Sequence, residues 1–319
     1  MEIVKKEQKA RIVQTSRFAG REKRSREYFF GFAEKIINQK VTLGKVRISE
    51  AYTSALRSFS HFRNGKDLPL TGMNSELLTL YEVWLHNRGV TRNTISFYMR
   101  ILRAIFNRGV KSGLVRQTYP FQNVYTGVEK TRKRAVSSQT IKQIRMLQLP
   151  AGSSLDFARD MFLFSFYTRG MSFVDMAYLR KRDLVGNTLA YSRRKTGQTL
   201  YIGWEKCMQD IVDKYNTTSY LLPIVEGKED TRRSYINALH LVNSRLKDIS
   251  VMLNITPPLT MYVARHSWAS IAKCMDVPIS VISEAMGHDS ETTTLIYLAS
   301  FDHSVIDKAN RKILEGIKG

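Results

Sequence analysis

The amino-acid sequence predicts a mostly α-helical fold with one small antiparallel β-sheet. Apolar residues recur at helical spacing over most of the chain, whereas the segment near residue 190 changes to short alternating stretches. The length of 319 residues is more than one compact core usually holds, so two domains are expected. With 43% hydrophobic residues, the chain has enough apolar material to build both cores and is not a disordered polybasic tail.

The first half is predicted to be a basic arm followed by four helices. Residues 1–26 carry nine Lys or Arg and are expected to form a solvated arm that orders on a polyanion; a flexible solubilising tail is an equal alternative. Asn64-Gly65, Gly89 and Gly113 mark helix ends, and Asn74 marks a helix start. The helices are expected at 28–37, 48–62, 75–88 and 92–112.

The second half is predicted to be helical around a small sheet. Strands are expected at 189–191 and 199–202, with Lys195-Thr196-Gly197 between them as a hairpin tip. Helices are expected at 138–147, 155–167, 205–214, 232–253, 260–274, 278–286, 291–298 and 304–317. The domains are therefore assigned as the arm 1–26, a helical domain 27–117, a basic linker 118–135 and a second domain 136–319.

The composition favours a nucleic-acid partner and narrows the chemistry. Lys and Arg number 50 against 28 Asp and Glu, which gives a formal net charge of +22. The two cysteines, Cys207 and Cys274, are not in a CxxC spacing, and no nucleotide-binding loop, HExxH motif or metal-spaced acidic cluster occurs. No apolar run is long enough to cross a bilayer. We expect a soluble, cytoplasmic protein that uses neither a metal nor a cofactor.

A phosphodiester can be cut without a metal by a nucleophile, cations on the phosphate and an acid for the leaving oxygen. Tyr297 offers a phenol as the nucleophile, and Arg265 offers a planar guanidinium on a predicted helix. Lys195 lies at the predicted hairpin tip, and His288 follows a Gly that ends a helix. Each residue alone is a weak signal, because a helical Tyr is usually part of a core and a single His is usually structural.

Their order and spacing resemble the tyrosine recombinase, or phage integrase, family. The matching stretches are FYTRGM at 166–171, RKTGQ at 194–198, ARHSWA at 264–269, and MGH at 286–288 followed by TLIY at 294–297. The first half, especially 91–106, is similar to the SAM-like core-binding domain of that family. The resemblance implies a helical SAM-like domain followed by an α+β catalytic domain.

The resemblance also implies a mechanism and a role for each residue. Tyr297 would attack the scissile phosphate to form a 3′-phosphotyrosyl link, and Arg169 and Arg265 would clamp that phosphate. Lys195 would protonate the 5′-oxygen and His288 would donate a hydrogen bond to the phosphate. No cofactor is implied. The implied partners are double-stranded DNA, further copies of the chain in a homotetramer on two DNA sites, and accessory DNA-bending proteins.

The sequence departs from the family pattern at two positions. Ser172 stands where the first arginine is usual, and Arg169 lies three residues earlier; if this stretch is helical, both would share one face. Tyr262 stands where the HxxR motif places a histidine. Either a field of arginines lowers the pKa of Tyr297, or Tyr262 has a mainly structural role, and His266 is expected to be structural.

The interpretation favoured by the sequence is a site-specific recombinase that inverts, excises or integrates a DNA segment. Two alternatives remain: a topoisomerase-like relaxing enzyme, and a catalytically impaired relative that occupies recombination sites. The predicted helix at 304–317 either closes its own core or docks on a neighbouring subunit.

Overall fold

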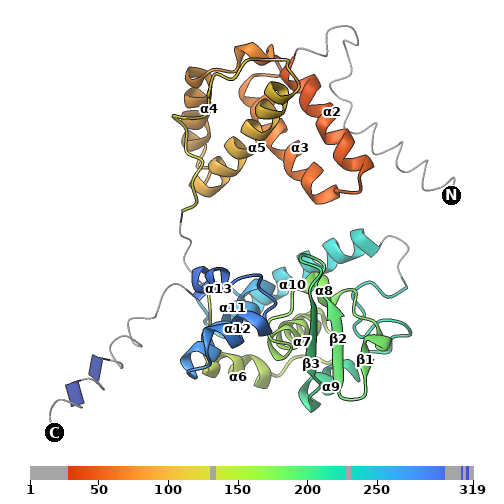
Figure 1. Cartoon of the computed structure of the whole chain (residues 1–319). Helices are drawn as coiled ribbons and strands as arrows, with labels where there is room; N and C mark the ends of the chain where they lie inside the picture. The colour runs from red at the N-terminus through yellow and green to blue at the C-terminus, as the bar shows by residue number, and fades with distance from the viewer. Residues whose placement is uncertain (1–27, 130–133, 228–230, 299–309, 312–313, 316–319) are drawn as a thin grey trace. The chain divides into compact units, whose positions relative to one another are not determined.

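The computed structural model describes residues 28–129, 134–227, 231–298, 310–311 and 314–315, without the side chains of residues 231, 296 and 297. The expected arm at 1–26 lies outside the described residues, as does most of the expected helix at 304–317. The chain divides into two compact units, Met1–Thr131 and Arg132–Gly319, which Figure 1 labels by element. No described helix combines the length and the apolar character that crossing a membrane would require.

The first unit contains the four predicted helices. They are α2 (Phe29–Thr42), α3 (Val46–Phe62), α4 (Ser75–Asn87) and α5 (Arg92–Lys111), with a short 3₁₀ turn at Leu70–Gly72. The Asn74 side chain accepts a hydrogen bond from the Leu77 backbone N–H at 2.8 Å and so caps the start of α4, as the sequence predicted.

Aromatic side chains build the core of the first unit. The ring of Phe59 lies 5.9 Å from that of Phe29, 6.1 Å from that of Phe30 and 5.0 Å from that of Tyr81, in edge-to-face arrangements that aromatic pairs favour. Phe121, which lies in the segment predicted to be a linker, is buried in the same core, so packing in this unit extends beyond residue 117.

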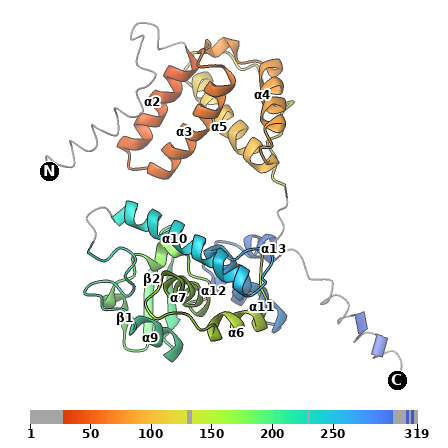
Figure 2. The same cartoon turned by 180° about the vertical axis from the view of Figure 1, so that it is seen from behind.

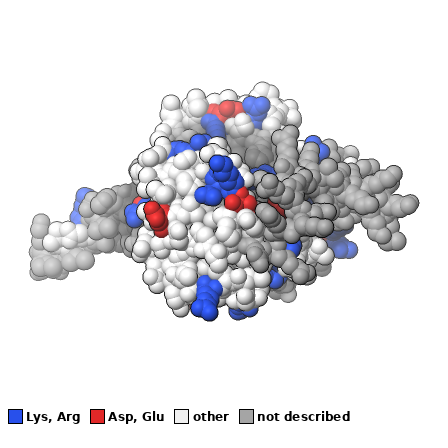
Figure 3. Space-filling view, turned by 90° about the horizontal axis from the view of Figure 1, so that it is seen from above, with Lys and Arg blue, Asp and Glu red and all other residues white. Residues whose placement is uncertain are grey.

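Helix α5 separates apolar from basic residues. Its buried side includes Met99, Leu102 and Ile105, whereas Arg100 and Lys111 are exposed. Lys and Arg also form separate groups, with Asp and Glu between them, on the face shown in Figure 3. The amphipathic pattern therefore fixes which side of α5 meets solvent and leaves that side positively charged.

The second unit is built around α7 (Ser154–Tyr167). This helix is buried on most of its surface and packs against α6 (Ser138–Met146), α9 (Lys206–Val212), α10 (Thr231–Met252) and α11 (Met261–Cys274). Figure 2 shows it from behind, among these elements. The remaining helices are α8 (Phe173–Met176), α12 (Ile279–Ala285) and α13 (Glu291–Leu298), with a 3₁₀ turn at Lys181–Asp183.

The predicted small sheet has the two expected antiparallel strands and a third, β1, that the sequence did not predict. They are β1 (Leu184–Val185), β2 (Thr188–Ser192) and β3 (Thr199–Gly203), in the spatial order β1-β2-β3. Leu189 pairs with Ile202 and Tyr191 with Leu200, and all of these side chains point into the core. Because Ser192 pairs with Thr199, residues 193–198 form the loop that connects β2 to β3 at the end of the sheet.

Candidate active site

Arg265 is buried on α11 with only 7% of its surface exposed. Its guanidinium donates hydrogen bonds of 2.7 Å to the carbonyl oxygens of Gly170 and Met286. Gly170 has a φ of +73°, and a Cβ there would lie 2.7 Å from the Arg265 Cα. Only glycine fits this close approach of the loop after α7, which therefore fixes the direction of the guanidinium.

His288 contacts Arg265 and α13 through its two ring nitrogens. Its Nε2 lies 3.0 Å from an Arg265 guanidinium nitrogen, and its Nδ1 lies 2.8 Å from the Thr294 hydroxyl. A guanidinium can only donate, so Nε2 accepts from Arg265 and the ring proton sits on Nδ1, which donates to Thr294. Partial burial and the charges of Arg265, Arg193 and Lys195 lower the pKa of His288 to about 4. The ring is therefore neutral near pH 7.

Lys195 lies at the tip of the β2–β3 hairpin, as the sequence predicted, and is exposed. The hairpin is closed by a 2.8 Å hydrogen bond from the Arg193 N–H to the Gln198 carbonyl and by one from the Gly197 N–H to the Arg193 carbonyl, also 2.8 Å. The charge of Lys195 opposes protonation of His288. The ammonium is thus within electrostatic reach of the cluster around Arg265.

Arg169 lies in a loop, so the helical spacing considered for 169–172 was wrong. α7 ends at Tyr167, and Arg169 takes the left-handed conformation with a φ of +60°. Its guanidinium donates a 3.2 Å hydrogen bond to the Tyr201 carbonyl on β3. Ser172 instead caps the start of α8 and donates a 2.6 Å hydrogen bond to the Asp175 carboxylate. Sharing one helix face therefore cannot explain how Arg169 would replace an arginine at position 172.

The Tyr191 phenol lies in the electrostatic field of three arginines. Burial and then the Asp175 carboxylate raise the pKa of this phenol to about 12, while Arg265, Arg193 and Arg169 act in the opposite direction. Arg169 and Arg265, which are far apart in the sequence, therefore both lie close enough to Tyr191 to oppose the rise in its pKa. The loop after α7 thus brings Arg169 near Arg265 without any helical continuity.

Tyr297 lies in α13, one turn after Thr294, and its side chain is outside the described residues. The contact between Thr294 and His288 connects this helix to Arg265. The fold therefore anchors the helix that carries the predicted nucleophile to the predicted phosphate clamp.

The part of the chain that the structure describes contains no group of three or more His, Cys, Asp or Glu residues arranged to hold a metal ion. The cluster around Arg265 consists instead of guanidinium, ammonium, imidazole and hydroxyl groups. These groups suit the binding of an anion such as phosphate.

Comparison with known proteins places this geometry in a known fold. Residues 28–124 match the family model of the phage integrase SAM-like domain. A lambda integrase dimer bound to a COC′ core site has 15% sequence identity and a TM-score of 0.65, covering 86% of this chain and 98% of that chain. The chain has the fold of a tyrosine recombinase.

Two further recombinase structures have the same fold. The Tn1549 transposon integrase in complex with a circular intermediate DNA is 13% identical with a TM-score of 0.66, over 90% of this chain and 99% of that chain. The XerH site-specific recombinase bound to a palindromic difH substrate is 15% identical with a TM-score of 0.66, over 87% and 83%. No curated protein sequence matches this chain.

Within this recombinase fold, the departure at Tyr262 is a surface feature. Tyr262 is 59% exposed, whereas His266, one turn further along α11, is buried. Their rings meet edge to face with centroids 4.3 Å apart. The His266 imidazole therefore lies in the interior. Tyr262, which stands where the HxxR motif has its histidine, lies at the surface.

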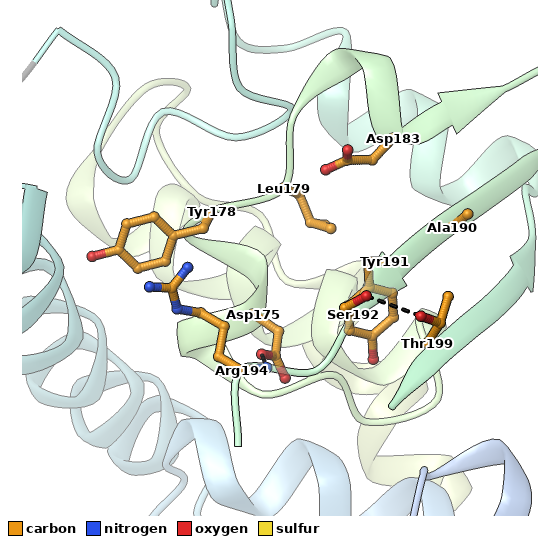
Figure 4. Close-up of a pocket in the computed structure, with 9 residues that line it drawn as sticks. All are labelled: Asp175, Tyr178, Leu179, Asp183, Ala190, Tyr191, Ser192, Arg194 and Thr199. Atoms are coloured by element: carbon orange, nitrogen blue, oxygen red, sulfur yellow. Dashed lines mark hydrogen bonds between the residues drawn. The ribbon is translucent and has the colours of Figure 1, made fainter. Parts of the chain in front are cut away.

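Two residues of the candidate site were not assigned from the sequence. Arg193 is buried and donates to the Gly287 carbonyl, and Asp175 accepts a 2.9 Å hydrogen bond from the Arg194 N–H. Figure 4 shows Asp175 beside the backbone of Arg194, whose guanidinium lies 4.0 Å from the centre of the Tyr178 ring. Strand alternation could have revealed the first residue, because Leu189, Tyr191 and Arg193 follow one face at a period of two.

Proposed function

We propose that this chain is a site-specific DNA recombinase in which Tyr297 cleaves and rejoins strands through a 3′-phosphotyrosyl intermediate. The observation that carries the proposal is the buried Arg265 guanidinium, which carbonyl oxygens hold in place and which contacts His288, whose other nitrogen contacts α13. This connection links an anion-binding group to the helix that bears Tyr297.

The proposed reaction exchanges one phosphate ester for another. The Tyr297 phenol gives up its proton to solvent as its oxygen forms a bond to phosphorus and the bond from phosphorus to the 5′-oxygen breaks, and the Lys195 ammonium gives the leaving oxygen a proton. Arg265 and Arg169 stabilise the negative charge that builds up on the phosphate. The ester bond energy is kept in the phosphotyrosyl link, so attack by a 5′-hydroxyl reseals the strand.

His288 must change its hydrogen bonding to act as a donor to phosphate. In the described structure its Nε2 accepts from Arg265 and so offers no proton. A bound phosphate brings negative charge beside the ring, which raises the pKa of the imidazole and favours a proton on Nε2. We therefore propose that His288 becomes a donor only when DNA occupies the site.

The proposed partners are duplex DNA and other copies of this chain. A formal charge of +22 and the basic exposed side of α5 favour a polyanion. The lambda integrase structures were obtained as a dimer on a core site and as a tetramer on a Holliday junction. We propose a homotetramer on two DNA sites, aided by accessory DNA-bending proteins, that integrates, excises or inverts a segment.

A covalent-trapping experiment tests the proposal. The chain is incubated with a nicked duplex that carries a site selected by binding, so that the fragment beyond the cut diffuses away and the strand stays attached to the protein. The wild type is expected to form an adduct stable to denaturant, and Tyr297→Phe to form none. Tyr119→Phe, at an exposed phenol of the first unit, is the matched control and should behave as wild type.

The outcome also separates the two alternatives. Tight binding without an adduct would mean that the chain is an impaired relative that only occupies sites. If the adduct forms, a plasmid with two sites should give exchanged products, whereas relaxation of a supercoiled plasmid without exchange would indicate a topoisomerase-like enzyme.

A further inference from the structure

Arg193 joins the hairpin that carries Lys195 to the turn that carries His288. It follows the last residue of β2, and only 7% of its surface is exposed. One of its terminal guanidinium nitrogens donates a hydrogen bond to the carbonyl oxygen of Gly287, the residue immediately before His288. A single side chain therefore connects two segments that are 94 positions apart in the sequence.

The hairpin packs against Gly287 without space for a side chain there. Gly287 has a φ of +63°, and a Cβ would lie 2.7 Å from the Arg193 Cδ and 3.0 Å from the Gln198 Oε1. Arg193 and Gln198 are also the two residues whose backbone groups close the loop around Lys195. The base of this loop is thus fixed on the Gly287 backbone from both sides.

Stability alone does not explain an arginine at this position. Among the described residues, the Arg193 Nε and the Gln198 Oε1 are buried without a hydrogen-bond partner. A buried charge that is incompletely paired costs free energy, and a non-polar side chain of similar volume would fill the space without that cost. The position therefore retains a charge and a hydrogen bond that packing does not require.

We propose that Arg193 is a positioning residue that holds Lys195 against the site formed by Arg265 and His288. This inference rests on the proposed function, in which Lys195 protonates the leaving 5′-oxygen. Without Arg193, the hairpin keeps its strands but loses its attachment to Gly287, so the ammonium is no longer held at the leaving oxygen. The step that fails is then the protonation of the leaving group, while the phosphate clamp remains.

A substrate with sulfur in place of the bridging 5′-oxygen tests this step selectively. A thiolate leaves without being protonated near neutral pH, because a thiol is far more acidic than an alcohol. Arg193→Met is expected to cut the oxygen substrate on the order of 10²-fold more slowly, in the range by which a positioned acid accelerates a reaction. Lys195→Ala should also be slow on oxygen, and both variants should approach the wild-type rate on sulfur. Arg265→Ala should remain slow on both substrates.

Controls separate positioning from general damage. Arg182→Met removes the same charge from an exposed position and should cut both substrates at the wild-type rate. DNA binding and thermal unfolding show whether each variant is folded. If Arg193→Met does not fold, Arg193→Lys, which keeps the charge, carries the test and should show a smaller loss on oxygen alone.

Two results would overturn the inference. The first is an equal loss on the oxygen and sulfur substrates in a folded variant that binds DNA, and the second is no loss on either. Failure of the proposed function has a different signature, because the wild-type chain would then form no adduct with either substrate.

Discussion

The side chains of Phe59 and Arg265 are both buried, but opposite kinds of side chain surround them. Phe59 is surrounded by other aromatic rings, whose burial stabilises the first unit through the hydrophobic effect. Arg265 is surrounded by carbonyl oxygens, an imidazole and the field of further cations. Burial of the aromatic rings lowers the free energy of the folded state, whereas the cluster around Arg265 keeps positive charges close together against their repulsion.

This difference indicates where function lies in the molecule. Positive groups repel one another when they are gathered in a partly dry site, and the pKa of His288 is lowered first by burial and then by that repulsion. An anion placed among them would relieve the repulsion. The cluster around Arg265 is therefore suited to an anion such as the proposed phosphate, whereas the core around Phe59 is held by apolar contacts.

The largest expected effect comes from removing the central cation of the cluster. Arg265→Ala should slow strand cleavage on the order of 10³-fold, because the group that stabilises the transition-state charge is lost. Its DNA affinity and the salt dependence of that affinity should stay near wild type, since the proposed DNA complex can draw on many other Lys and Arg for contacts with the DNA backbone. Single-turnover cleavage and binding titrations at several salt concentrations measure both quantities.

Arg100→Ala serves as the control, because Arg100 is exposed on the basic side of α5. It should weaken binding slightly and leave cleavage at saturating DNA unchanged. A large loss of binding by Arg265→Ala, with the cleavage rate of the bound complex preserved, would contradict the role given to Arg265.

A change in the aromatic core should affect folding and leave chemistry intact. Phe59→Ala should lower the free energy of unfolding of the first unit by about 3–5 kcal/mol, as expected when a fully buried ring leaves a cavity. Hydrogen exchange of the full chain, resolved by segment, should show faster exchange in α3 and unchanged protection in α7. Leu80→Ala, at a side chain that is 56% exposed, should change exchange very little. Faster exchange throughout α7 would show that the two units unfold together.

The sequence predicted the longer elements because each follows a local rule, whereas it did not predict the short β1 and α8. Helix α5 shows the helical period of apolar residues with Gly113 after it, and the hairpin shows strand alternation on both sides of Lys195. These signals depend on neighbouring residues only. They place the elements within a few residues of where the structure has them.

The geometry of the candidate site required information that no local pattern contains. The side chain of Arg169 reaches β3 because a non-glycine residue takes a positive φ after α7, a rare conformation that the sequence did not indicate. The resemblance named Arg265 and His288 together, but their contact depends on how α11 packs against the end of α12. The assignment of Tyr297 as the nucleophile stays a prediction.

The smallest expected effect is the pH dependence contributed by His288. Its folded pKa of about 4 lies below its ordinary value of 6.5, so the unfolded chain binds more protons between these values. This contribution to stability is complete above about pH 6.5 and is lost as the pH falls towards 4. For a half-exposed ring, solvent screening reduces it to on the order of 1 kcal/mol. In His288→Gln, the free energy of unfolding should therefore fall less between pH 6.5 and pH 4, by that amount, in unfolding titrations at a series of pH values.

Histidine ring NMR on the full chain measures the same property directly and extends it to the DNA complex. The His288 signal, assigned by its loss in His288→Gln, should show a neutral ring protonated at Nδ1 at pH 6. Bound DNA should raise the pKa of this ring, because a phosphate beside Arg265 reverses the local field. An unchanged pKa in the complex would place the phosphate away from His288. It would also remove the main reason for assigning different roles to the charged cluster and the aromatic core.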